Sequence, residues 1–332
     1  MTRVLLAVVI LWSMLAMSTG ATPTARPSPP TQPASGPGGS TYRFDQVRAE
    51  RVGASPTGFW LFSPERAADM DPLPVVVFLH GFSAVEPFGY GAWIDHIVRR
   101  GAVLIYPDYQ TKDLTQTSSG DYQSNAFAGI EAALALLGAG HAGPVDLDSI
   151  AIVGHSLGAV LALNIAALAG GLKLPPVAAV MSAEPGGCAE CGGISSLIGL
   201  PYADLSGIGQ HTRVIVMVGA DDQVVTDEGA RTAWTMLTNV PAENRDYIVM
   251  HSDHRGIPPL IADHYAPLAA NDEADVDAMD WYGTWKLFDL LTDCCFQDQG
   301  CETSFGGSSI ETSMGTWSEG TPVVPLSVTE TP

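Results

Sequence analysis

The chain has 332 residues, 46% of them apolar, and it carries a formal net charge of −21. This length and apolar content suit one large domain or two smaller ones with a sizeable core. A surface with such an excess of negative charge repels nucleic-acid phosphates and anionic lipid headgroups. We therefore expect no nucleic-acid partner and no binding to acidic membranes.

The N-terminus has the composition of an export signal followed by a linker. Arg3 precedes an apolar stretch over residues 4–17, which is too short to cross a bilayer comfortably. Residues 1–21 are predicted to be a secretory signal peptide, with no stable membrane insertion after cleavage. Residues 22–40 are rich in Pro, Ser, Thr and Gly, which is typical of a disordered linker. We expect a monomer that is secreted or held in the periplasm or cell envelope.

Export makes disulfide bonds permissible. Two bridges and one free thiol can be drawn from five cysteines in fifteen ways, five choices of free thiol times three pairings. A local Cys188–Cys191 bridge is one possibility, with Cys301 joined to Cys294 or Cys295. The Cys-x-x-Cys spacing also occurs in zinc and thioredoxin-like sites. A structural disulfide is favoured here, because the flanks are Gly-rich and no second such pair follows.

From residue 41 onward, short apolar runs alternate with longer segments of helical periodicity. The expected strands are residues 57–64, 72–82, 102–109, 149–154, 176–185, 212–220 and 245–252, and the expected helices are residues 90–101, 124–140, 157–170 and 276–296. Buried strands separated by helices predict an α/β domain, with a mostly parallel central sheet and helices on both faces. We assign this domain to residues 41–301 and a C-terminal extension to residues 302–332.

A serine lies in the sharp turn between one of these strands and the next helix. The sequence there is Gly154-His155-Ser156-Leu157-Gly158. The glycines keep the space beside the turn free, so that the serine can hold a strained backbone with its hydroxyl exposed above the sheet. The alternative is a chance match at an Ala/Gly-rich helix start, with the serine only capping the helix. The strand–turn–helix context favours a nucleophile.

A serine nucleophile requires a general base and an acid that orients the base. In this architecture they follow the serine in the order acid, histidine, at the carboxyl ends of later strands. Asp221 and Asp222 follow one strand, and His251 and His254 end the next. We choose Asp222, which stands three residues after the glycine that ends its strand, and keep Asp221 as the alternative. We choose His254, which lies further into its loop, and keep His251 as the fallback.

The reaction also needs two N–H donors for a developing oxyanion. Leu157 follows the serine at a helix N-terminus, so its amide is one expected donor. The second should come from the loop after an early buried strand. There His80-Gly81 lets the backbone approach closely, and the amide of Phe82 is our choice.

Together these segments resemble the α/β-hydrolase superfamily. The motifs HGF at 80–82, GHSLG at 154–158, GADDQVV at 219–225 and a late histidine stand in that family's order, across about residues 42–295. The contexts of Phe82 and His155 are most similar to secreted lipases, cutinases and polyester hydrolases, with dienelactone-hydrolase-type enzymes close by. The resemblance implies hydrolysis of a neutral carboxylic ester (a lipid, a small ester or a polyester) through an acyl-enzyme on Ser156, without a cofactor.

Two other functions are compatible with such a scaffold. One is an acyltransferase that passes the acyl group to an alcohol other than water. The other is a non-catalytic binding protein that retains the fold. The intact set Ser156, Asp222 and His254 argues against the binding protein.

The segment 186–212 falls between two core strands, where insertions often cover the site. Leu197, Ile198, Leu200 and Tyr202 could line an acyl pocket beneath such a small lid, and the alternative is an ordinary surface loop.

A metal cluster is the competing interpretation of the histidine segment, with ligands from His251, Asp253, His254, Asp263 and His264. The spacing matches no helical zinc motif, and the prolines between the histidines would break a helix. We therefore expect no metal.

Overall fold

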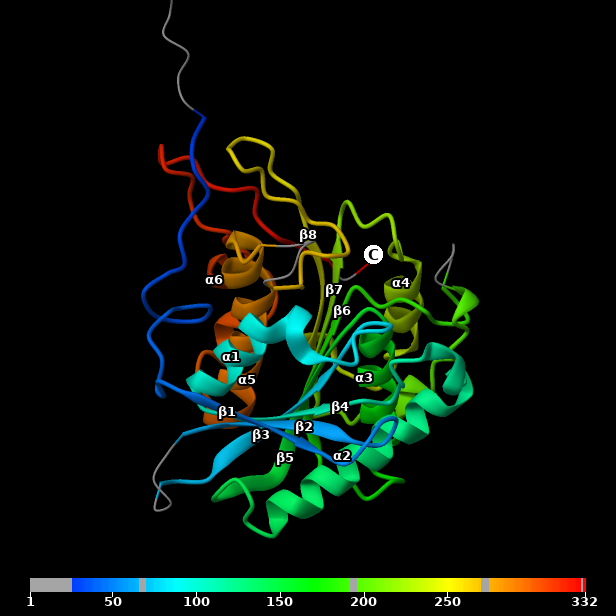
Figure 1. Ribbon diagram of the computed structural model, residues 1–332. Coiled ribbons are helices and arrows are strands. Elements are labelled where there is room, and N and C mark those ends of the chain that lie inside the picture. Colours follow the sequence, from blue (N-terminus) through cyan, green and yellow to red (C-terminus); the bar gives the residue numbers. More distant parts are fainter. Residues whose placement is uncertain (1–25, 66–69, 192–195, 270–274, 330) are drawn as a thin grey trace, which may run out of the picture.

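The structure is a computed structural model that describes residues 26–65, 70–191, 196–269, 275–329 and 331–332. The predicted signal peptide lies outside the described residues. Within them, one sheet has the strand order β1-β2-β4-β3-β5-β6-β7-β8-β9 (Figure 1). The strands are β1 Val47–Val52, β2 Phe59–Pro64, β3 Leu73–Leu79, β4 Val103–Pro107, β5 Val145–His155, β6 Val177–Ala183, β7 Arg213–Gly219, β8 Arg245–Met250 and β9 Ser327–Thr329.

Most of this sheet is parallel, as the sequence predicts. Strands β4, β3, β5, β6, β7 and β8 pair in parallel, whereas β2 is antiparallel to both β1 and β4, and β9 is antiparallel to β8. This strand order with its antiparallel second strand defines the α/β-hydrolase fold. The carboxyl ends of the parallel strands therefore meet at one edge, where the loops after β5, β6, β7 and β8 come together.

Helices cover both faces of the sheet (Figure 1). Helices α1 (Gly91–Arg100) and α5 (Trp285–Gln297) pack on one face, and α2 (Tyr122–Gly138), α3 (Leu157–Leu168) and α4 (Glu228–Met236) pack on the other. A π-helical turn over Asp280–Thr284 leads into α5, and a short helix α6 covers Ser309–Thr312. One apolar core lies on each face of the sheet. Because both faces of the central strands are buried, these strands are continuous apolar runs in the sequence.

Two strands and two helices were not predicted from the sequence. Strand β1 reads VRAERV and lies partly exposed at the sheet edge, so it has no apolar run to reveal it. Strand β9 has 3 residues, α6 has 4 and α4 has 9, and segments this short show little periodicity.

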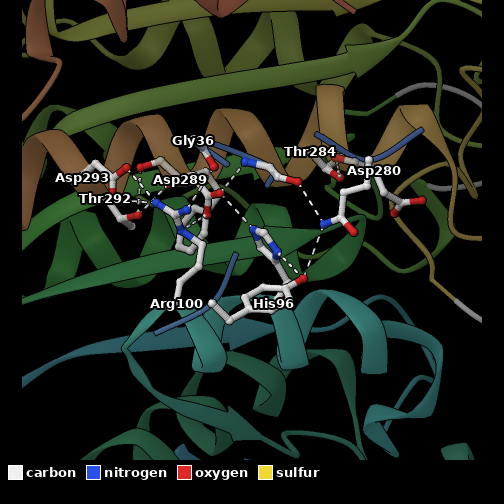
Figure 2. A network of polar contacts seen from close by, with 12 residues as sticks. Gly36, His96, Arg100, Asp280, Thr284, Asp289, Thr292 and Asp293 are labelled. Carbon is white, nitrogen blue, oxygen red and sulfur yellow. Dashed lines mark hydrogen bonds and ion pairs between the residues drawn. The ribbon is translucent and has the colours of Figure 1, made fainter. Parts of the chain in front are cut away.

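The prediction of a disordered linker is wrong for residues 26–40, because this segment is bound to the domain. The Gly38 N–H donates to Asp289 Oδ2 of α5 at 2.6 Å, and Arg100 of α1 donates to the Gly36 carbonyl at 3.3 Å (Figure 2). His96 Nε2 and Arg100 Nε also contact the Asp289 carboxylate, at 2.9 and 3.1 Å. Buried charged partners on two helices therefore hold a segment whose own composition predicts disorder.

The domain boundary at residue 301 is also wrong, because the C-terminal extension belongs to the same fold. Its strand β9 extends the sheet beside β8. Trp317 is 1% exposed and donates its Nε1–H to Asp253 Oδ2 at 2.9 Å. The extension also meets the N-terminal segment, where the Ser28 N–H donates to Ser318 Oγ at 3.0 Å.

The cysteines form two local bridges. Cys188 pairs with Cys191 at a Cα–Cα distance of 5.0 Å, and Cys294 pairs with Cys301 at 4.8 Å. Cys295 is free. The local Cys188–Cys191 bridge considered from the sequence is therefore present. Of the two candidates for pairing with Cys301, Cys294 forms the bridge and Cys295 does not.

Among the described residues, no helix combines the length and the apolar content that crossing a bilayer requires.

Candidate active site

Ser156 occupies a strained turn between β5 and α3. Its φ and ψ are 56° and −122°, a conformation that is costly for any residue with a side chain. A β-carbon on Gly154 would collide with the Gly158 carbonyl, and one on Gly158 would collide with the Leu79 carbonyl of β3. This confirms the steric role predicted for the two glycines. Ser156 is thereby held above the carboxyl edge of the sheet, with 8% of its surface exposed.

The imidazole that meets this serine is that of His264. Its Nε2 lies 3.0 Å from Ser156 Oγ, and its Nδ1 lies 2.8 Å from Asp222 Oδ2. All three residues are buried. This is the hydrogen-bonded order of a nucleophile, a general base and an orienting acid.

Asp222 is fixed by the backbone of its own loop. Its Oδ1 accepts the N–H groups of Val224 and Val225 at 2.8 and 2.9 Å, which leaves Oδ2 for His264. Asp221 is exposed, and its N–H is held by the Ala262 carbonyl at 3.0 Å. The structure therefore brings Asp222, and not its neighbour, to the imidazole.

The expectation that His254 reaches the serine is wrong. After β8 the chain makes an excursion that closes by pairing Asp253 with Leu260, through N–H···O distances of 2.8 and 3.0 Å. His254 stands at the exposed start of that excursion, whereas His264 follows its return to the sheet. The fallback His251 is bound elsewhere, with Nε2 at 2.8 Å from Ser327 Oγ. In the sequence, the prolines at 258 and 259 are the signal that the chain turns back between His254 and His264.

A second buried histidine, His155, is hydrogen-bonded to the backbone of His264. Burial, and after it the neighbouring His264, hold the pKa of His155 well below its usual value, so this ring is neutral. Its Nε2 lies 2.9 Å from the His264 carbonyl, which can only accept, so the ring proton is on Nε2. Its Nδ1 then accepts the Tyr90 hydroxyl proton at 2.7 Å, and the Tyr90 oxygen accepts the Gly81 N–H at 2.9 Å. One chain of hydrogen bonds thus links the loop after β3 to the backbone of His264.

Tyr90→Phe tests this chain. We expect kcat for an activated ester to fall about tenfold to a hundredfold, because small displacements of catalytic groups carry costs of that size. Stability should fall by about 1–3 kcal/mol, since the Gly81 N–H and His155 Nδ1 lose their partner. Steady-state kinetics and urea unfolding measure the two effects. The matched control is Tyr247→Phe, whose equally buried hydroxyl has no hydrogen-bond partner among the described residues. Equal effects of the two substitutions would contradict the role given to Tyr90.

The two N–H groups expected to hold an oxyanion flank the serine. Leu157 is the first residue of α3, and the first N–H groups of a helix have no acceptor within it. Gly81 lies beside the serine, because a β-carbon on it would be 3.5 Å from the Ser156 Cβ. The N–H of the next residue, Phe82, has no acceptor in the described part of the chain. Both amides are therefore available to a bound ligand.

The residues of segment 186–212 separate into two groups. Ile198 and Leu157 both reach the space above Gly187, each 3.1 Å from where its β-carbon would stand, so Ile198 lies beside the turn that holds Ser156. Leu197 is 81% exposed. Leu200 and Tyr202 instead pack in the core, and the Tyr202 hydroxyl donates to the Gly229 carbonyl at 3.0 Å. The structure therefore does not place Tyr202 in an open acyl pocket.

The metal cluster considered from the sequence does not form in the described residues. Asp253 accepts hydrogen bonds from Trp317 and two backbone N–H groups, and His254 is exposed. A different trio, His155, Glu184 and His264, has one potential ligand atom each within 4.8 Å of one another. The ring nitrogens of both histidines are already hydrogen-bonded within the protein, so a cation would have to displace those contacts.

The fold is similar to that of solved fungal enzymes. One is a fungal esterase from Rhizomucor miehei, with 14% identity, a TM-score of 0.47, and coverage of 63% of this chain and 75% of that chain. Another is carboxyl esterase 2 from the mycorrhizal fungus Tuber melanosporum, with 16% identity, a TM-score of 0.48, and coverage of 62% and 75%. No protein-family model and no curated protein matches the sequence. One fold hosts many functions, so the chemistry of a protein is determined by the residues of its site.

Proposed function

We propose that the chain is an exported serine hydrolase that cleaves neutral carboxylic esters. The observation that carries the proposal is the continuous hydrogen-bonded row Ser156–His264–Asp222, with distances of 3.0 and 2.8 Å, at the carboxyl edge of the sheet. The two local disulfides accord with an oxidising compartment.

The geometry supports acyl transfer in two steps. Ser156 Oγ attacks the ester carbonyl carbon while its proton passes to His264 Nε2, and the Phe82 and Leu157 N–H groups hold the oxyanion. Collapse of the tetrahedral intermediate breaks the bond to the alcohol, which takes the proton from Nε2. Water then gives a proton to His264 and attacks the acyl-enzyme, and the proton returns to Oγ as the acid leaves. Asp222 keeps the Nδ1–H of His264 oriented and stabilises the imidazolium.

The surroundings of the site favour an apolar substrate. Large apolar side chains are exposed on its loops, with Phe82 at 40%, Val224 at 37% and Tyr265 at 38% of their surface. Val224 follows the acid by two residues, and Tyr265 directly follows the base. With a net charge of −21, the protein also repels anionic substrates. A neutral ester with an apolar acyl group fits both features.

A fluorophosphonate probe tests the proposal, because it reacts with a serine only when that serine is activated. We expect one label per chain, on Ser156, and loss of p-nitrophenyl butyrate hydrolysis as labelling proceeds. Ser156→Ala should abolish both signals, whereas Ser40→Ala, an exposed serine of the N-terminal segment, should change neither. Folded wild-type protein that takes up no label would contradict the proposal.

A further inference from the structure

A buried carboxyl group beside the proposed triad has no role in the mechanism above. Glu184 directly follows β6 and is 0% exposed. Its φ is 51°, in the left-handed region that residues with a side chain rarely adopt. Its N–H donates to the Met217 carbonyl of β7 at 2.7 Å, which holds the residue in this conformation. Strained backbone that the surrounding structure maintains is characteristic of functional positions.

The carboxyl group faces both histidines of the site. Glu184 Oε2 lies 3.5 Å from His155 Nε2 and 3.6 Å from His264 Nδ1. The hydrogen atoms on these nitrogens have nearer acceptors, the His264 carbonyl at 2.9 Å and Asp222 Oδ2 at 2.8 Å. Oε2 is therefore placed as the next acceptor for both. The Glu184 oxygens accept no side-chain hydrogen bond within ordinary distance from the described residues, and the backbone of Gly219 is the further polar group that acts on them.

Within the part of the chain that the structure describes, no arginine or lysine lies near Glu184 to explain a structural ion pair. The titratable groups that interact with it there are His155, His264, Asp222, Asp263 and Tyr90. Burial, and after it the charge of Asp222, raise the pKa of Glu184 well above its ordinary value. Removal of Asp222 would take away the nearest negative charge and favour ionisation of Glu184.

The fold also makes room for this side chain at the next strand. A β-carbon on Gly219, at the end of β7, would lie 2.8 Å from Glu184 Oε1. The glycine that precedes Asp222 by three residues thus allows a second carboxyl group to reach the same imidazole.

We propose that Glu184 is a positioning residue of this site, which orients the His155 and His264 rings and replaces Asp222 as the acceptor of the His264 Nδ1–H when Asp222 is removed. The inference rests on the proposed ester hydrolysis at Ser156. Its physical basis is that His264 gains a positive charge when it takes the serine proton, and a second carboxyl group on the Nδ1 side stabilises that charge.

A double-mutant cycle tests the proposal, with kcat/KM for p-nitrophenyl butyrate normalised to fluorophosphonate-titrated sites. Loss of the triad acid alone typically costs about 10⁴-fold in kcat. We expect Asp222→Ala to cost only about 10²- to 10³-fold, because Glu184 substitutes. Glu184→Gln alone should lower kcat/KM by less than about tenfold. In the Asp222→Ala background the same substitution should lower kcat/KM by a further factor of at least about ten. The matched control is Glu131→Gln, an exposed acid on α2, which should have no effect in either background.

A second readout does not depend on turnover. The His264 Nδ1 proton should give a low-field NMR signal that Glu184→Gln shifts and Glu131→Gln does not. If Glu184→Gln does not fold, Glu184→Asp serves in its place, since it keeps the carboxyl group but withdraws it from the two rings. The proposal would be overturned if Glu184→Gln lowered kcat/KM by the same factor in both backgrounds, or if it left the chemical shift of the Nδ1 proton unchanged. Either result would leave the proposed ester hydrolysis at Ser156 intact. A wild-type protein that neither labels nor turns over would overturn both.

Discussion

His264→Ala is expected to lower kcat for ester cleavage by about 10⁵- to 10⁶-fold, the cost typical of removing the base of a serine triad. The imidazole Nε2 lies 3.0 Å from Ser156 Oγ, and no other histidine of the described chain hydrogen-bonds that oxygen. Without it, the hydroxyl keeps its proton and attacks an ester only as fast as background chemistry allows. Single-turnover and steady-state assays of the purified variant measure the loss, and circular dichroism verifies the fold.

His254→Ala is the matched control, because it removes an imidazole only ten positions earlier in the same loop. This side chain is exposed and has no hydrogen bond within the described residues, so we expect kcat within about twofold of wild type and unchanged stability. A large loss with His254→Ala and a small one with His264→Ala would mean that the loop adopts a different path in solution.

Asp289→Ala is expected to lower the free energy of unfolding by about 3–5 kcal/mol, as removal of one partner from a buried charged network typically does. The Asp289 side chain is 3% exposed, and it accepts contacts from Arg100, His96 and the Gly38 N–H (Figure 2). Each of these donors loses an acceptor, and the N-terminal segment loses its anchor on α5. Urea unfolding gives the change, and the loss of the anchor should appear as faster proteolysis within residues 26–40.

Asp293→Ala provides the comparison on the same helix. Asp293 also pairs with Arg100, at 2.8 Å, but its side chain is 22% exposed. Water can solvate the groups left behind, so the expected loss is about 1 kcal/mol. Neither substitution touches the serine turn, and the activity per labelled site should stay constant. Equal losses of stability would mean that burial of Asp289 does not determine its contribution.

Several features were determined by the sequence alone, because they depend on contacts within a few residues. The alternation of buried strands and helices predicted the parallel sheet, and the two glycines around Ser156 predicted a turn that admits no side chains beside it. Sterics and periodicity of this kind act along the local chain, so they can be recognised without knowing what packs against it.

Other features were decided only by the tertiary structure. His264 and not His254 meets the serine because the Asp253–Leu260 pairing closes the loop between them. The N-terminal segment is ordered because Asp289, some 250 residues later, accepts its Gly38 N–H. Glu184 reaches His264 because β6 and β7 end side by side at the same edge. Each of these contacts joins residues far apart in the chain, and its formation depends on the path of the intervening backbone, which no short stretch of sequence encodes.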